Sequence, residues 1–354
     1  RRRHAHGDRD AVSHPPLAPG HVDAPHRTFA LGDLRLESGE TIADYRQSFV
    51  VHGELDAARS NAVLVCPALT ATHHRLDFLI GPGRALDPAR WCIVAADPIG
   101  NGLSTSPSNS NSQPGMRFPR FALRDMVAAQ HRLLVEHLGI ERLHAVVGAS
   151  MGGMQALQWA TSFPAFMSRI VAMTPMARTS PWAALVTETA RACLLADPAW
   201  RGDGFTARPE RGWRAYTGLM SALLMRTPEA VSSLRDATEA KVWFDDLVDL
   251  QSQLAFDAHD YLYQSWAYDA HDVGTTPGFG GDTAAALRSI VARTLLLAPP
   301  LDLFNPATAA REAAASIAGA RFVEIPSPLG HLAATSTRAA DADFLNRRVA
   351  DFLA

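Results

Sequence analysis

One stretch of the chain, residues 143–160, constrains the fold more than any other. It reads LHAVVGASMGGMQALQWA: an apolar, β-branched run, then small residues, then apolar positions that no longer alternate as in a strand. This order predicts a strand, a sharp turn and a helix. At the turn, Gly148, Ser150 and Gly152 form the pattern G-x-S-x-G, in which a strained turn projects the serine hydroxyl beyond the end of a parallel sheet.

The same pattern predicts chemistry at Ser150. A Cβ at Gly148 or Gly152 would press on the neighbouring strand and helix, so both glycines suit a tight elbow. The N-terminal N–H groups and the dipole of the following helix favour negative charge beside the serine. A chance match is the alternative, but average residue usage gives on the order of 0.1 such matches in a chain of this length. We therefore interpret Ser150 as a nucleophile.

The composition limits the classes of function. A net charge of -3 offers no basic surface for nucleic acid, and no apolar run approaches the roughly 20 residues of a membrane span. The 354 residues, 47% of them hydrophobic, can form one α/β domain with a large insertion, or two domains. The three cysteines are an odd number, and Cys66 and Cys92 fall in apolar runs. This favours free thiols in a reducing, cytoplasmic compartment.

Residues 1–27 differ in composition from the rest of the chain. They are rich in Arg, His, Pro and Gly and contain no apolar core of a signal peptide. We expect a flexible N-terminal extension there. No fold is predicted to hold its histidines, so a metal site is not expected; these histidines are His4, His6, His14, His21 and His26.

Strand-like segments begin at residue 28 and predict a sheet. Residues 28–36 and 41–52 are separated by a turn and indicate an antiparallel pair at a sheet edge. Residues 61–66 and 91–96 are apolar on both faces, as central parallel strands are. Another such strand, residues 169–174, follows the elbow helix.

The alternation of strand and helix stops between residues 176 and 285. This range contains helix-like stretches with many aromatic residues, at 182–195, 216–224 and 247–256. A separate domain is one interpretation, but strand patterns resume at 293–298 and 321–325. We therefore expect a helical lid, residues 176–285, inserted into an α/β core of residues 28–175 and 286–354.

The last two strands precede candidates for the base and the acid that a serine nucleophile requires. Asp302 follows the strand at 293–298, and His331 follows the strand at 321–325. Both residues are predicted at the carboxyl edge of the sheet, the same edge as Ser150. Their order along the chain, serine then acid then histidine, is that of the α/β-hydrolases.

The competing candidates fit less well. His259 and His271 follow the elbow but fall in the expected lid, and we interpret them as surface or packing residues. Three aspartates come after His331 and break the order; they are Asp341, Asp343 and Asp351. In the α/β-hydrolase arrangement, two backbone N–H groups form the oxyanion hole, one from the loop after the strand at 61–66 and one from the residue after the nucleophile. Leu69 and Met151 are our candidates.

Several motifs resemble those of homoserine O-acetyltransferase and its relatives in the α/β-hydrolase superfamily. They lie at residues 118–119, 124–127, 148–160, 197–200, 256–263 and 269–274. The resemblance runs from about residue 29 to the end. It implies an α/β-hydrolase fold with a mostly parallel eight-stranded sheet, an acyl-serine intermediate, and a homodimer paired through the lid. It also implies that Ser150, Asp302 and His331 form the catalytic triad.

Three departures from the family pattern bear on the substrate. The family motif His-Ala-Leu-Thr-Gly is replaced by PALTA at residues 67–71, and its Gly/Cys-rich loop is replaced by residues 97–107. The family's lid motif G-L-x-x-A-R carries an arginine for the carboxylate of the amino acid. Leu223 stands at that place. A buried carboxylate without this partner loses a strong charge-assisted bond, so homoserine is not the expected substrate.

We therefore expect a carboxylic ester hydrolase for small or medium, largely apolar esters that uses no metal or cofactor. The alternative is an O-acyltransferase that moves an acetyl group from acetyl-CoA to an alcohol, with Arg226 or Arg178 binding the anion. Leu223 and Arg226 are the expected residues of the substrate pocket. A binding module without turnover is a third hypothesis, which the intact triad candidates disfavour.

Overall fold

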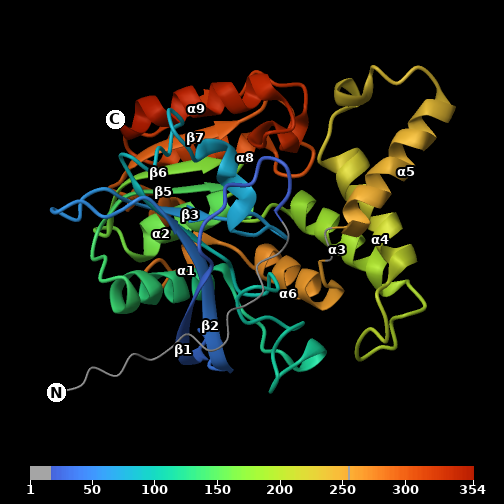
Figure 1. Cartoon of the computed structure of the whole chain (residues 1–354), viewed down its shortest axis with the longest axis horizontal. Helices are drawn as coiled ribbons and strands as arrows, with labels where there is room; N and C mark the ends of the chain where they lie inside the picture. Colours follow the sequence, from blue (N-terminus) through green and yellow to red (C-terminus); the bar gives the residue numbers. More distant parts are fainter. Residues whose placement is uncertain (1–16, 254–255) are drawn as a thin grey trace.

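The computed structural model describes residues 17–253 and 256–354, and its strands form one sheet (Figure 1). The sheet has eight strands in the order β1-β2-β4-β3-β5-β6-β7-β8. The edge strand β1 (Arg27–Arg35) pairs antiparallel with β2 (Thr41–His52), and β2 pairs antiparallel with β4 (Cys92–Ala96). All other pairs are parallel; these strands are β3 (Ala62–Cys66), β5 (Leu143–Ala149), β6 (Met167–Met173), β7 (Arg293–Ala298) and β8 (Arg321–Glu324). The expected mostly parallel eight-stranded sheet is confirmed.

Helices cover both faces of the sheet. On one face pack α1 (Leu123–Arg132) with its π-helical extension η3 (Leu133–His137), α2 (Met151–Ser162), α7 (Thr283–Arg288) and α8 (Ala307–Ser316). On the other pack η1 (His73–Leu79) and α9 (Ala339–Leu353). In β5, Val146 joins the first cluster, whereas Ala145 and Val147 join the second. The central strands are thus buried on both faces, as their sequences predict.

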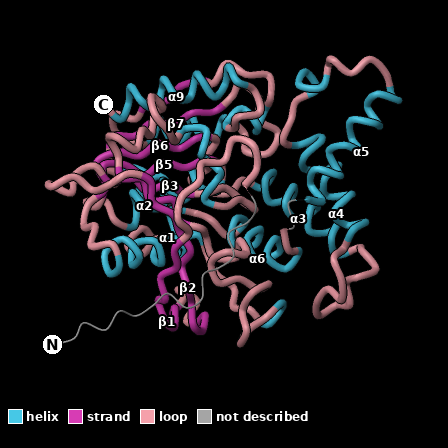
Figure 2. Tube along the Cα trace, viewed as in Figure 1, coloured by secondary structure: helices cyan, strands magenta, loops and turns pink. Residues whose placement is uncertain are grey.

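A helical insertion, residues 176–285, separates β6 from β7. Its elements are α3 (Pro181–Leu195), α4 (Glu210–Tyr216), η4 (Thr217–Leu224), η5 (Pro228–Val231), α5 (Ala237–Gln253), α6 (Ala258–Asp269), η6 (Val273–Thr275) and the start of α7. Figures 1 and 2 show α3, α4 and α5 beside the sheet, with α5 farthest from it. A helix was expected at 247–256, but α5 begins ten residues earlier, at Ala237. No helix was expected at α6.

The N-terminal segment corrects one expectation. Of the predicted flexible extension, residues 1–16 lie outside the described residues. The described remainder contacts the core: the Val22 N–H donates to Asp77 Oδ2 at 2.7 Å, and the ring of His21 stacks on that of His74 at 4.0 Å. His21 and Val22 are thus held by partners far along the chain, whereas residues 17–20 are exposed.

Two sequence expectations concern the thiols and the helices. Cys66 and Cys92 are buried, Cys193 is half-buried, and all three are free. The prediction of buried free thiols is thus confirmed for Cys66 and Cys92. Within residues 17–253 and 256–354, no helix is both long and apolar enough to cross a membrane.

Candidate active site

Ser150 lies at a strained turn between β5 and α2. Its backbone angles are φ 56° and ψ -122°, in a region that costs a residue with a side chain about 1–2 kcal/mol. The flanking glycines permit the turn. A Cβ on Gly148 would lie 2.0 Å from the carbonyl oxygen of Gly152, and a Cβ on Gly152 would lie 1.9 Å from that of Cys66. The predicted strand, turn and helix are therefore present, and these clashes explain both glycines.

The structure brings Ser150, Asp302 and His331 together. His331 Nδ1 lies 2.8 Å from Asp302 Oδ2, and His331 Nε2 lies 2.9 Å from Ser150 Oγ. All three side chains are buried. Since an ionised carboxylate only accepts, Nδ1 carries the proton in the neutral imidazole and Nε2 accepts from the serine hydroxyl. This arrangement can take a proton from Ser150 and stabilise the imidazolium that results.

The loop after β7 sets the direction of the Asp302 carboxylate. Asp302 Oδ1 accepts the N–H groups of Phe304 and Asn305, each at 2.9 Å. The other oxygen, Oδ2, is thereby left to face His331.

The loop that carries His331 is held by the helical insertion. The Leu332 N–H donates to the carbonyl of Met225 at 3.2 Å, and the Thr227 hydroxyl donates to the carbonyl of Pro328. A cavity of about 480 Å³ lies between residues 227–229 of the insertion and the loops after β7 and β8. The insertion thus contacts the loop of the candidate base directly.

The two candidate oxyanion donors lie on either side of the elbow. Met151 is the first residue of α2, and Leu69 lies in the loop after β3. Among the described residues, neither backbone N–H donates a hydrogen bond, which leaves both available to an oxyanion. The loop is held by α6: the Thr70 N–H donates to Gln264 Oε1, and Gln264 Nε2 donates to the carbonyl of Ile99, both at 3.0 Å.

The two expected pocket residues lie on η4 and two residues after it. The side chain of Leu223 is 65% exposed on η4. The guanidinium of Arg226 donates to the carbonyl of Ser221 and lies over the ring of Trp243, 5.3 Å from its centroid. Among the described residues, no hydrogen bond or ring contact joins Leu223 or Arg226 to Ser150, Asp302 or His331.

The competing histidines occupy other places. His259 Nε2 accepts the Phe205 N–H at 3.2 Å. His271 is buried, and desolvation lowers its pKa to about 4, so its ring is neutral at physiological pH. Within the described part of the chain, neither histidine forms a hydrogen bond with Ser150, which agrees with their interpretation as surface or packing residues.

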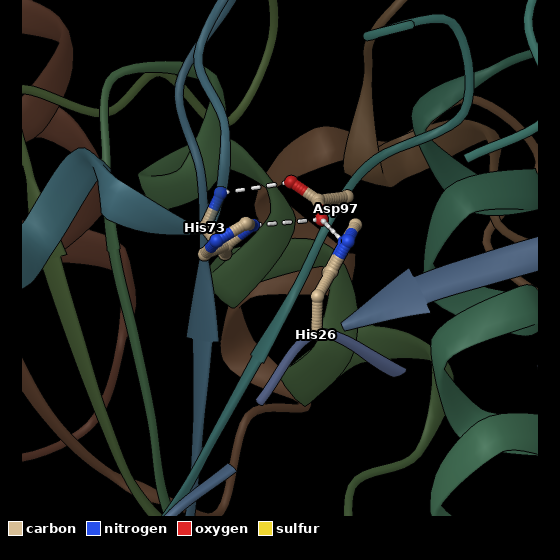
Figure 3. Close-up of side chains that lie close together, drawn as sticks. All are labelled: His26, His73 and Asp97. Carbon is tan, nitrogen blue, oxygen red and sulfur yellow. Dashed lines mark hydrogen bonds and ion pairs between the residues drawn. The ribbon is translucent and has the colours of Figure 1, made fainter. Parts of the chain in front are cut away.

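One group of the described residues has the spacing of metal ligands: His26, His73 and Asp97 (Figure 3). Asp97 Oδ2 lies 2.9 Å from His73 Nδ1 and 3.7 Å from His26 Nε2. The Ser48 hydroxyl stands in the space between, 2.5 Å from His26 Nε2 and 2.6 Å from Asp97 Oδ2. In this structure the three residues and Ser48 form a hydrogen-bond network.

This network also compensates a buried charge. Burial raises the pKa of Asp97, but His73 and the hydrogen bonds outweigh burial and hold the pKa well below its usual range. Asp97 Oδ1 accepts the backbone N–H of His73 at 2.8 Å and Nδ2 of Asn101 at 2.9 Å. His26 joins this network, contrary to the expectation that no fold holds the N-terminal histidines; His4, His6 and His14 lie outside the described residues.

The chain is similar in sequence to known hydrolases and acetyltransferases. Residues 61–333 match the family model for the alpha/beta hydrolase fold. The chain is 33% identical over 340 residues to an ethyl acetate hydrolase of Pseudomonas veronii, covering 93% of this chain and 95% of that protein. It is 35% identical over 337 residues to a homoserine O-acetyltransferase of Caulobacter vibrioides, covering 84% and 87% respectively.

Similar solved structures include both kinds of protein. The acetyl esterase MekB superposes with a TM-score of 0.85 at 31% identity, over 93% of this chain and 96% of that one. A homoserine O-acetyltransferase from Bacillus anthracis superposes with a TM-score of 0.81 at 25% identity, over 93% and 97%. The resemblance inferred from the motifs is confirmed.

Proposed function

The chain belongs to the α/β-hydrolase fold family, and on that premise we propose that it is a serine hydrolase that cleaves small or medium carboxylic esters. The observation that carries the proposal is the position of His331, which bridges Ser150 Oγ at 2.9 Å and Asp302 Oδ2 at 2.8 Å. These three residues are the proposed catalytic triad. No metal or other cofactor is needed for this chemistry.

In the first half of the reaction, Ser150 Oγ attacks the ester carbonyl while His331 Nε2 takes the serine proton. Asp302 stabilises the imidazolium through its bond to Nδ1. The N–H groups of Leu69 and Met151 stabilise the negative oxygen of the tetrahedral intermediate. His331 then gives the proton to the departing alcohol, and Ser150 is left as an acyl ester.

In the second half, water attacks the acyl-serine while His331 Nε2 takes a proton from it. The tetrahedral intermediate then collapses, the bond between the acyl carbon and Ser150 Oγ breaks, and His331 returns the proton to Ser150 Oγ as the carboxylic acid leaves. Water is favoured over an amino-acid alcohol because the residue at the place of the carboxylate-binding arginine is apolar. Leu223 replaces the arginine of the family motif, and the Arg226 guanidinium is engaged by Ser221 and Trp243. A carboxylate without the arginine loses a charge-assisted hydrogen bond, a loss that water does not incur.

A second candidate function is O-acyl transfer from acetyl-CoA to an alcohol. The observation that favours it is the set of relatives named homoserine O-acetyltransferase, at 30–35% identity. In that case acetyl-CoA is a co-substrate, and an arginine such as Arg226 or Arg178 would have to turn toward the anion.

The two functions are separated by the acyl acceptor. The purified protein is incubated with 4-nitrophenyl acetate, alone and with homoserine, and separately with acetyl-CoA and homoserine. The hydrolase proposal expects turnover with water alone, no acceleration by millimolar homoserine, and no O-acetylhomoserine by mass spectrometry. Efficient formation of O-acetylhomoserine by the unmodified protein would replace the hydrolase proposal with the transferase.

We further propose that the helical insertion is a lid and a dimer surface. The lid is supported by its contacts with the loops of Thr70 and His331. The dimer is supported by large apolar side chains that remain exposed on the insertion; they are Trp182 and Leu185 on α3, Leu223 on η4, and Val242 and Leu250 on α5. The free thiols support a reducing, cytoplasmic compartment.

A further inference from the structure

Asn305 joins the loop of the acid to the segment that anchors the nucleophile. Its backbone N–H is one of the two donors to Asp302 Oδ1. Its side-chain Nδ2 donates to the carbonyl of Thr174 at 2.8 Å. Thr174 follows Met173, whose carbonyl accepts the Ser150 N–H at 2.8 Å. A shift of the Asn305 side chain would therefore move Asp302 relative to Ser150.

The remaining bond of the Asn305 side chain comes from Tyr268. The Tyr268 hydroxyl, on α6 of the insertion, donates to Asn305 Oδ1. The direction of this bond is determined by its neighbours: Asn305 Nδ2 is committed to the Thr174 carbonyl, so Oδ1 is the atom that faces the tyrosine and it can only accept. Tyr268 therefore spends its single proton on Asn305.

The ring of Tyr268 also packs against the triad loop. It stacks on Phe304, with centroids 5.5 Å apart and planes 7° from parallel, and Phe304 meets the His331 ring edge-on at 5.1 Å. Burial raises the pKa of Tyr268 well above its usual value, although the hydrogen bond to Asn305 acts in the opposite direction. The hydroxyl thus stays protonated at neutral pH and remains a donor to Asn305 Oδ1.

We propose that Tyr268 is a positioning residue of the active site, which holds Asp302 in register with His331 and Ser150 through the Asn305 side chain. The proposal rests on the proposed function for its choice of substrate. The insertion would in this way supply a part of the active site, although all three triad residues come from the sheet.

The consequence concerns the transition state. Without the hydroxyl, Asn305 Oδ1 becomes an unpaired acceptor in a dry site, and the loop of residues 302–305 relaxes to find another donor. Asp302 then compensates the imidazolium less well at the moment when that charge forms. Because the loss falls on charge that develops during reaction, kcat falls while KM changes little.

The test compares Tyr268→Phe with Tyr261→Phe. Tyr261 lies on the same helix and is equally buried, but its ring packs against Trp213 and Tyr216. With 4-nitrophenyl acetate, Tyr268→Phe should lower kcat about 10-fold, as expected for one lost hydrogen bond, with KM within about 2-fold of wild type. Tyr261→Phe should keep wild-type kcat. Equal losses in both variants would overturn the proposal.

Asn305→Ala supplies the second comparison. If Tyr268 acts through Asn305, adding Tyr268→Phe to Asn305→Ala should cost less than about 2-fold more, since the partner is already gone. A full, independent 10-fold loss in the double variant would contradict the proposed route. Thermal unfolding of each variant shows whether the fold is retained. In Tyr268→Phe the aromatic ring is still present, so its contact with Phe304 is kept.

The rate at which a fluorophosphonate probe labels Ser150 separates this proposal from the choice of acyl acceptor. Labelling needs only an activated serine, whatever the natural substrate. It should slow about 10-fold in Tyr268→Phe and be unchanged in Tyr261→Phe. If the wild-type protein shows no ester turnover but its labelling still depends on Tyr268, only the hydrolase proposal is wrong. If the labelling rate does not depend on Tyr268, the positioning role of Tyr268 is wrong.

Discussion

The central strands of the sheet and the outer helices of the insertion differ in how they bury side chains. Every residue of β3 and β4 is buried. The 17-residue helix α5, in contrast, buries Leu247 alone. Burial on both faces leaves the strands no freedom of register, so the loops at their carboxyl ends meet in one arrangement. The outer insertion has no such constraint and presents apolar side chains to its surroundings.

The helix α6 belongs to the insertion by sequence but to the core by packing. Most of its residues are buried, and its polar side chains reach loops of the sheet: Gln264 bonds to Thr70 and Ile99, and Asp260 bonds to Ser108. A helix of the insertion therefore holds loops around the candidate active site.

The largest expected effect follows from removing the proposed nucleophile at the edge of the sheet. Ser150→Ala should reduce ester turnover at least about a thousandfold, because removal of a triad nucleophile typically costs more than that. Its unfolding temperature should match wild type, since one hydroxyl is lost at the sheet edge. Ser162→Ala, at the other end of α2, is the control and should keep full activity. Comparable activity in both variants would refute the assignment of the nucleophile.

The next effect tests the outer insertion. If exposed apolar residues of α3 pair two copies of the chain, Leu185→Arg places a charge on each side of a symmetric interface. The dissociation constant of the dimer, measured by analytical ultracentrifugation, should rise about 100-fold or more. Val291→Arg is the matched control, because Val291 is also exposed but lies outside the insertion, just before β7. A wild-type monomer, or equal weakening by both variants, would reject the surface.

A smaller effect tests whether α6 supports the oxyanion loop. Gln264→Ala removes the acceptor of the Thr70 N–H, next to Leu69, and should lower kcat about 10-fold. Gln158→Ala serves as control, since Gln158 is equally buried but bonds to Ser162 and Thr276. Steady-state kinetics with 4-nitrophenyl acetate measures both. Unchanged kcat in Gln264→Ala would show that the loop holds itself.

The smallest effect is one of stability. Desolvation raises the pKa of Asp260 from 3.8 to about 8. The folded state then holds this proton more tightly than the unfolded chain does, so the contribution of Asp260 to stability is complete below about pH 4 and is lost as pH rises to about 8. Asp260→Asn, which stays neutral, should gain on the order of 3 °C in unfolding temperature relative to wild type between pH 6 and pH 9.

Asp257→Asn is the control for this pH dependence. Asp257 caps the same helix, and although burial raises its pKa, the interaction with His259 and the capping bonds lower it overall. Its contribution is therefore present throughout the range from pH 6 to pH 9 and should not change across it. A pH-independent difference between Asp260→Asn and wild type would contradict the raised pKa.

The sequence predicted the sheet, and the three candidate triad residues that lie together at its edge, because their signals are local. An apolar run indicates a buried strand, the G-x-S-x-G pattern indicates a sharp turn before a helix, and polar residues directly after strands indicate loops at the edge of the sheet. The helix α6 was missed because it is buried almost all round, with Asp260, Gln264 and Ser265 on buried faces, so no amphipathic period marks it. The contacts of His21 and Val22 were missed because His74 and Asp77 hold them from outside the segment.

In the proposed reaction, Ser150 forms an acyl ester that water hydrolyses. Rapid mixing with 4-nitrophenyl acetate, acid quenching and mass spectrometry of the digested protein measure this ester directly. We expect an acetyl group on the peptide that contains Ser150 and none in Ser150→Ala. This acetyl group should be lost at the same rate with and without homoserine. An acetyl group that persists in water and disappears only when an alcohol is added, or that is found on another residue, would contradict the account.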